Sequence, residues 1–106
     1  MSDVQQQITE LVTGNPVVLF MKGTPSFPMC GFSARVVEIL KSIEVPFEAV
    51  NVLADPAVRE GVKAYSNWPT IPQLYVNGQL VGGCDITVQM HGAGELAPLL
   101  QKAAQA

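Results

Sequence analysis

The segment Lys22–Leu40, KGTPSFPMCGFSARVVEIL, carries a single cysteine where a loop punctuated by prolines meets an apolar, helix-like run. Immediately before it, Val17–Met21 is uniformly apolar and rich in β-branched residues, which predicts a strand covered on both faces. The helix that follows should end at Val45-Pro46. Cys30 is therefore expected at the start of a helix. The apolar stripe of that helix comprises Phe32, Val36, Ile39, Leu40 and Ile43.

Local signals elsewhere predict five more elements. Apolar residues at helical spacing over 4–12 predict an N-terminal helix, and FEAVNV at 47–52 predicts a second strand. Asp55-Pro56 is typical of an N-cap followed by proline at the first helical position. Asn77-Gly78 between two apolar runs predicts a tight antiparallel hairpin.

The last part of the chain should be helical. Asp85 is expected to cap a helix that runs to about Met90, and three leucines after Gly94 indicate a final one. The complete order predicts an α/β fold, with a four-stranded mixed sheet flanked by helices on both faces and an extra N-terminal helix.

The composition is that of a single domain spanning residues 1–106. Hydrophobic residues make up 48% of the chain and charged residues 14%, so it should fold around one modest core. A net charge of -3 without any basic block argues against nucleic acid as a partner. No targeting segment is visible, and the longest apolar run, PVVLFM, is far too short to span a bilayer. We therefore expect a cytoplasmic protein that does not enter a membrane.

Cys30 has the surroundings of a reactive thiol. The free N–H groups and the dipole of a helix start favour a thiolate, and Lys22 adds positive charge nearby. The simpler interpretation is a buried structural cysteine. Ser33 occupies the position where a dithiol motif keeps its second cysteine. Any disulfide chemistry at Cys30 must then finish with an external thiol.

Three motifs, in this order, resemble the monothiol glutaredoxins, a family with a thioredoxin-like fold that is named for its Cys-Gly-Phe-Ser motif. They are KGTPSFPMCGFS at Lys22–Ser33, NWPTIPQLYVNG at Asn67–Gly78 and GGCDI at Gly82–Ile86. The resemblance extends over essentially the whole chain and departs from the family pattern at no motif position. It implies that the external thiol is glutathione.

The resemblance also implies a glutathione site. Lys22 and Arg59 would meet the glycine carboxylate, and the backbone of Ile71, in Thr70-Ile71-Pro72 with a cis peptide before Pro72, would pair with the extended tripeptide. From the residues alone, the alternative for Arg59 is a solvated surface charge and the alternative for Pro72 is an ordinary trans proline.

The third motif supplies the opposite side of this site. Gly83 allows close approach of the backbone, the helix start at Cys84 can take the α-carboxylate, and Asp85 can take the ammonium group. Cys84 is equally a small buried hydrophobe, and the alternative for Asp85 is a pure helix cap. Phe32 and Trp68 should flank the cleft, and His91 is expected to be a surface charge rather than a metal ligand.

Counting ligands leads to the functional prediction. A [2Fe-2S] cluster needs four ligands, and one chain offers Cys30 plus the sulfur of a bound glutathione. Two chains related by a two-fold axis complete the set, so we predict a homodimeric carrier that delivers clusters to apo iron-sulfur proteins, with Cys30 as metal ligand. A BolA-like protein is a further partner that the family implies.

Two other functions remain open. The first is a glutathione-dependent oxidoreductase that removes glutathione from protein mixed disulfides, with Cys30 as the catalytic nucleophile and at most weak activity. One observation argues against this function: seven residues separate Lys22 from Cys30, a longer loop than in dithiol glutaredoxins. The resemblance implies that this loop shifts glutathione away from the attack geometry. The second is an adaptor that only docks partner proteins, for which the sequence offers no evident exposed apolar stripe.

Overall fold

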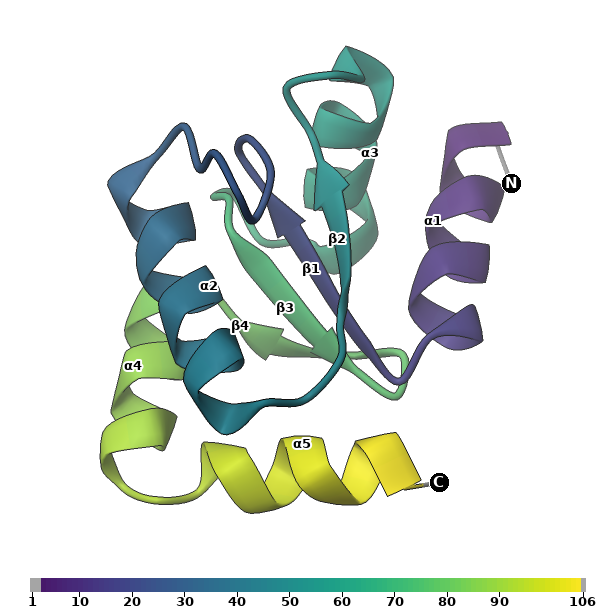
Figure 1. Ribbon diagram of the computed structural model, residues 1–106. Coiled ribbons are helices and arrows are strands. Elements are labelled where there is room, and N and C mark those ends of the chain that lie inside the picture. Colours follow the sequence, from purple (N-terminus) through teal and green to yellow (C-terminus); the bar gives the residue numbers. More distant parts are fainter. Residues whose placement is uncertain (1–2, 106) are drawn as a thin grey trace.

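The structure, a computed structural model, describes residues 3–105, and its elements follow the predicted order (Figure 1). Within that range, no helix is both long enough and apolar enough to cross a membrane. The helices are α1 (Asp3–Gly14), α2 (Gly31–Ile43), α3 (Pro56–Ser66), α4 (Cys84–Gly92) and α5 (Leu96–Gln105), and the strands are β1 (Val17–Met21), β2 (Glu48–Asn51), β3 (Gln73–Val76) and β4 (Gln79–Gly82).

The strands form one mixed sheet in the order β2-β1-β3-β4. Strand β1 pairs in parallel with β2, to which α2 connects it, and antiparallel with β3. The hairpin between β3 and β4 turns at Asn77 and Gly78, whose φ angles of 50° and 81° lie in the left-handed region, as its sequence predicts. The predicted four-stranded mixed sheet is confirmed.

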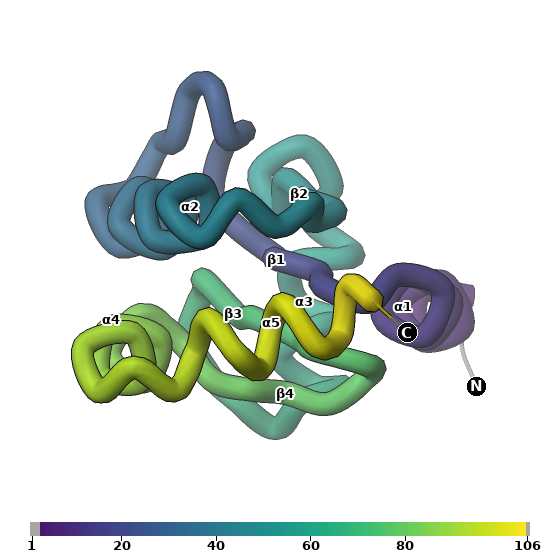
Figure 2. The backbone as a smooth tube through the Cα atoms, turned by 60° about the horizontal axis from the view of Figure 1, so that its bottom comes forward, coloured from purple at the N-terminus to yellow at the C-terminus, as the bar shows by residue number. Residues whose placement is uncertain are grey.

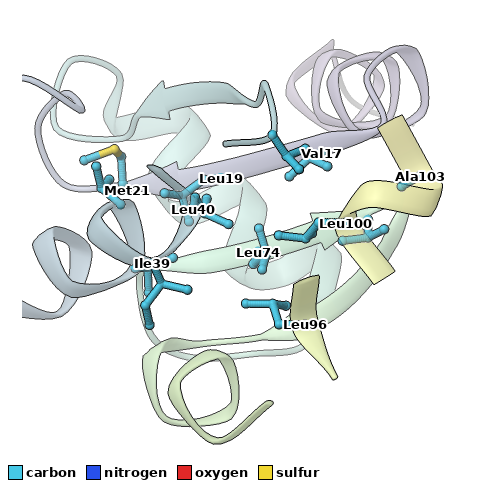
Figure 3. Close-up of a cluster of buried hydrophobic side chains, with 13 residues drawn as sticks. Val17, Leu19, Met21, Ile39, Leu40, Leu74, Leu96, Leu100 and Ala103 are labelled. Carbon is cyan, nitrogen blue, oxygen red and sulfur yellow. The ribbon is translucent and has the colours of Figure 1, made fainter. Parts of the chain in front are cut away.

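Helices cover both faces of the sheet (Figure 1). All five residues of β1 are buried, which confirms the prediction drawn from its uniform apolarity. Val17, Leu19 and Met21 pack on the face covered by α2, α4 and α5, together with residues such as Leu74 and Leu100 (Figure 3). Val18 and Phe20 face the other way, into a second cluster with residues of α1 and α3.

The helix starts that matter for function are set locally. Asp55 caps α3 as predicted, because its carboxylate accepts hydrogen bonds from the backbone N–H groups of Ala57 and Val58 at 3.1 and 3.3 Å. Cys30 is the N-cap of α2, with extended backbone at φ -151° and ψ 135°. The loop between β1 and α2 extends beyond the helices (Figure 2). Cys30 thus lies between this projecting loop and the first turn of α2.

Candidate functional site

A cleft of about 650 Å³ lies where five segments of the chain meet. They are the end of β1, the start of α2, the middle of α3, the loop before β3 and the start of α4. Every site residue predicted from the sequence lines this one cleft, although the positions span residues 22–85. They are Lys22, Cys30, Arg59, Thr70, Ile71, Pro72, Gly83, Cys84 and Asp85, and the expected flanking aromatics Phe32 and Trp68 line it too.

Cys30 is a partly exposed, free thiol at the start of α2. The backbone N–H of Ser33 lowers the pKa of the Cys30 thiol below its ordinary value, against the opposing effect of burial. The N–H of Phe32 and the positive charge of Lys22 act in the same direction as Ser33. This agrees with the thiolate predicted from the helix start and Lys22.

Cys84, the second free thiol, has the opposite electrostatics. Burial raises the pKa of the Cys84 thiol, and the adjacent carboxylate of Asp85 raises it further. At any given pH, Cys84 is therefore less ionised than an ordinary cysteine, whereas Cys30 is more ionised. The two sulfurs of one cleft are thus chemically distinct.

We expect Cys30 to react with iodoacetamide at lower pH than Cys84. The reagent attacks thiolates, and the Cys30 thiolate population declines only when pH falls through a pKa that lies below the ordinary value. For Cys84 the decline should begin at higher pH. Mass spectrometry of Cys84→Ser and Cys30→Ser proteins over a pH series would follow each thiol alone. The pH at which the alkylation rate is half-maximal depends on the pKa of the thiol and not on its accessibility. Equal midpoints for Cys30 and Cys84 would therefore contradict the opposite pKa shifts of the two thiols.

Ser33, which replaces the second cysteine of a dithiol motif, also has a structural role. Its side chain has no exposed surface, and its Oγ accepts a hydrogen bond of 3.0 Å from the backbone N–H of Lys22. This bond joins the end of β1 to the first turn of α2. It therefore fixes Lys22 relative to Cys30, the two groups whose charges interact.

Replacing Ser33 by alanine should destabilise the fold. The N–H of Lys22 would lose its acceptor inside the protein, which costs about 1–3 kcal/mol. Urea unfolding would measure the loss, with Ser42→Ala as the control. Ser42 donates to the carbonyl of Ile39 at an exposed position, so its removal should change the free energy of unfolding by less than about 0.5 kcal/mol. Equal losses in the two variants would refute this role for Ser33.

The loop of residues 23–29 is a compact, internally bonded hairpin. The N–H of Met29 donates to the carbonyl of Lys22 at 2.9 Å, and Thr24 and Phe27 exchange backbone hydrogen bonds of 3.1 and 3.2 Å. Gly23 has φ +92°, and a Cβ there would lie 2.5 Å from the carbonyl oxygen of Phe27. The side-chain oxygen of Asn51 accepts from the N–H of Gly23 at 2.9 Å. The long loop predicted to separate Lys22 from Cys30 is therefore tightly ordered.

Large apolar side chains are exposed around Cys30, which the sequence interpretation missed. Phe27, Met29 and Phe32 expose 76%, 70% and 62% of their surface. The sequence offered no evident exposed apolar stripe, whereas the structure shows exposed apolar side chains beside Cys30. The reason is that the closed hairpin turns Phe27 and Met29 away from the core, while Phe32 points outward from the first turn of α2.

The loop before β3 forms one wall of the cleft. The peptide bond between Ile71 and Pro72 is cis, as the resemblance predicted. Gly83 lies against this wall, where a Cβ would come within 3.3 Å of both the carbonyl oxygen of Pro72 and Nε1 of Trp68. A Cβ at this position would require its neighbours to give by a few tenths of an ångström, so the start of α4 lies close against the wall.

Asp85 does not cap α4, contrary to the prediction. The N-cap is Gly83, and no side chain closes this end of the helix. Instead, the Gly83 carbonyl accepts hydrogen bonds from the N–H and the hydroxyl of Thr87, at 3.1 and 2.8 Å, and the helix therefore begins at Cys84. Asp85 lies in the first turn, exposed and at the cleft. Its carboxylate is thus placed to contact a ligand rather than its own backbone.

The opposite wall is positively charged. Lys22 and Arg59 line it as predicted, and Lys63, one turn after Arg59 on α3, is a third cation that the sequence analysis missed. The spacing of four residues from Arg59 was the available signal. Lys63 pairs with Glu60 at 3.2 Å. Nε of Arg59 is buried without a hydrogen-bond partner, while the side chain as a whole lines the cleft.

Comparison with known proteins gives the family. A protein-family model described as glutaredoxin matches residues 17–81. The chain belongs to the glutaredoxin family. The rice protein Monothiol glutaredoxin-S7, chloroplastic, is 54% identical over 95% of this chain and 60% of its own length. A monothiol glutaredoxin of Synechocystis, described as uncharacterized, is 52% identical over 95% of this chain and 94% of its own.

A solved structure places the chain in the same fold. The reduced apo form of poplar GrxS14, determined in solution, has 51% sequence identity and a TM-score of 0.83, and the match covers 97% of this chain and 94% of the poplar chain. The architecture is therefore the thioredoxin-like fold of the glutaredoxins, and the resemblance to monothiol glutaredoxins is confirmed. The chain spans about three fifths of the rice relative and nearly all of the Synechocystis protein.

Proposed function

We propose that this glutaredoxin binds glutathione in the cleft and that two such complexes share one [2Fe-2S] cluster, which is the cargo delivered to apo-proteins. The observation that carries the proposal is Cys30, a partly exposed thiol of lowered pKa without a second cysteine in its motif, in a cleft with a cationic wall. A thiolate that has no local partner for a disulfide stays available to iron.

The charges of the cleft suit glutathione, which carries two carboxylates and one ammonium group. Its volume of about 650 Å³ falls within the ~300–1,000 Å³ typical of small-molecule sites. The guanidinium of Arg59 and the charge of Lys22 would hold one carboxylate. The N-terminus of α4, which no side chain caps, would hold the other, and the exposed carboxylate of Asp85 would hold the ammonium group.

The third wall would align the peptide part of glutathione. Thr70, Ile71 and Pro72 line the cleft immediately before β3, where their backbone can pair with an extended peptide as an added strand does. When bound, glutathione would supply a second thiolate beside that of Cys30. Among residues 3–105, no three His, Cys, Asp or Glu side chains gather into a metal site, so a cluster needs ligands from outside one chain.

A second copy of this chain would complete the ligand set. Four ligands follow from two Cys30 thiolates and two glutathione thiolates. The exposed Phe27, Met29 and Phe32 beside Cys30 offer apolar surface that a second subunit would cover. Because half of the ligands are diffusible, the cluster would be held loosely enough to pass to an apo-protein or to a mixed complex with a BolA-like partner.

Glutathione-dependent reduction of mixed disulfides is the second candidate. The lowered pKa of Cys30 favours it equally, since the thiolate can attack the glutathione sulfur of a protein mixed disulfide and release the protein thiolate. A second glutathione thiolate would then attack the Cys30 mixed disulfide, which yields oxidised glutathione and restores the Cys30 thiolate. The family resemblance implies that the long loop before Cys30 shifts bound glutathione away from the attack geometry, which favours the carrier over the oxidoreductase.

Anaerobic reconstitution tests the proposal directly. Incubation with iron, sulfide and glutathione should give a coloured dimer, seen by visible absorbance and size-exclusion chromatography, and removal of glutathione should dissociate it. Omission of glutathione during loading is the matched control. A colourless monomer that rapidly reduces a small mixed disulfide of glutathione would overturn the carrier function and support the oxidoreductase.

A further inference from the structure

Gln73, the first residue of β3, is a polar side chain buried in the core. It has no exposed surface and lies on the same face of β3 as Tyr75, which belongs to the hydrophobic cluster beneath α1 and α3. A carboxamide in such a place is costly unless its polar atoms are bonded. The residue was not among the predicted site residues and does not line the cleft.

Each end of the Gln73 carboxamide has a defined partner. Nε2 donates to the backbone carbonyls of Trp68 and Thr70, at 3.0 and 3.2 Å, and Oε1 accepts from the hydroxyl of Tyr75 at 3.0 Å. The reverse orientation would place an oxygen against two carbonyl oxygens, so only this one fits. Burial raises the pKa of Tyr75 to about 12, and its hydroxyl therefore remains a proton donor near neutral pH.

The two carbonyls belong to the wall of the cleft. Trp68 and Thr70 both line it, and the N–H of Trp68 is held from the other side by Ser66 Oγ at 3.0 Å and the Lys63 carbonyl at 3.3 Å. The wall is thus attached to α3 at one end and, through Gln73, to the core at the other. A substitution at Gln73 would therefore move Trp68 and Thr70, which line the cleft, although Gln73 itself does not.

We propose that Gln73 is a positioning residue for the ligand of this cleft: its buried carboxamide fixes the Trp68–Thr70 wall at the spacing that glutathione requires. The inference rests on the proposed glutathione function. Gln73 itself would not contact the ligand. A purely structural role would instead lower stability and leave the geometry of the folded cleft unchanged.

The test compares Gln73→Leu with Val12→Ala at a temperature where both are fully folded. Val12 is buried in the same hydrophobic cluster, on α1 and away from the cleft, so its truncation controls for lost stability. By isothermal titration calorimetry, Gln73→Leu should bind glutathione about tenfold to a hundredfold more weakly than wild type, the usual effect of a misplaced binding group. Val12→Ala should bind as wild type does. Equal affinities in the two variants would overturn the proposal.

A second measurement needs no ligand. Amide resonances of Trp68, Thr70 and Ile71 should shift in Gln73→Leu and stay in place in Val12→Ala. If wild type binds no glutathione, the proposed function fails, and the resonances still decide the role of Gln73. Should Gln73→Leu not fold, Tyr75→Phe serves instead: loss of its hydroxyl removes one of the three hydrogen bonds that fix the carboxamide and leaves Oε1 unpaired in the core, so the same resonances should shift, by a smaller amount. Unchanged resonances of Trp68, Thr70 and Ile71 in the folded variant would overturn the proposal.

Discussion

Replacing Cys30 by serine is expected to abolish cluster loading and dimer formation together. Serine keeps an oxygen at the N-cap of α2, a position that it favours, so the fold should be retained. Its hydroxyl stays protonated near neutral pH and is a poor ligand for the iron of a cluster compared with a thiolate. After anaerobic reconstitution with glutathione, the variant should be a colourless monomer by visible absorbance and size-exclusion chromatography.

Cys84→Ser is the matched control. The sulfur of Cys84 lines the same cleft, but burial and Asp85 raise the pKa of its thiol, so it is poorly suited to act as a ligand. We expect this variant to keep both the colour and the dimer. A colourless Cys84→Ser protein would make Cys84 a ligand, or a disulfide partner of Cys30, and a coloured Cys30→Ser protein would remove Cys30 from the ligand set.

Much of this site follows from the sequence because its signals are local. A strand, a cysteine and a helical stripe in succession place Cys30 at a helix start whatever the rest of the chain does. Asp55-Pro56 and Asn77-Gly78 likewise act through their own backbone geometry. The gathering of Lys22, Arg59 and Gly83 in one cleft is different, since no local rule brings them together. That expectation came from the family resemblance, and the common cleft agrees with it.

What the sequence could not predict depends on contacts distant in the chain. Asp85 resembled an N-cap, but Thr87 donates a hydrogen bond to the carbonyl of Gly83, which is the N-cap. Asp85 therefore lies inside the first turn of α4. Gln73 is a polar residue at the start of the otherwise apolar strand β3, where it could have been exposed, yet β3 lies between β1 and β4 and all four of its residues are buried. Recognising that a polar residue there must find buried partners requires the strand order, which the pairing of β1 with β3 establishes.

Replacing Arg59 by alanine is expected to weaken glutathione binding by about tenfold to a hundredfold, the loss associated with one charge-assisted hydrogen bond. The Nε of Arg59 is buried without a partner, and the residue lies on the cationic wall with Lys22 and Lys63. A ligand carboxylate would accept charge-assisted hydrogen bonds from this guanidinium. Since alanine removes an unsatisfied polar atom, the free energy of unfolding without ligand should fall little or not at all.

Arg35→Ala provides the control, because the chain has only these two arginines. Arg35 is exposed on α2, does not line the cleft, and pairs with Glu38 only at 3.9 Å. Calorimetric titration should find its glutathione affinity unchanged, whereas the deficit of Arg59→Ala should shrink as added salt screens the carboxylate attraction in wild type. If both variants lost affinity equally, the effect would reflect net charge, and if neither did, glutathione would not be held by this wall.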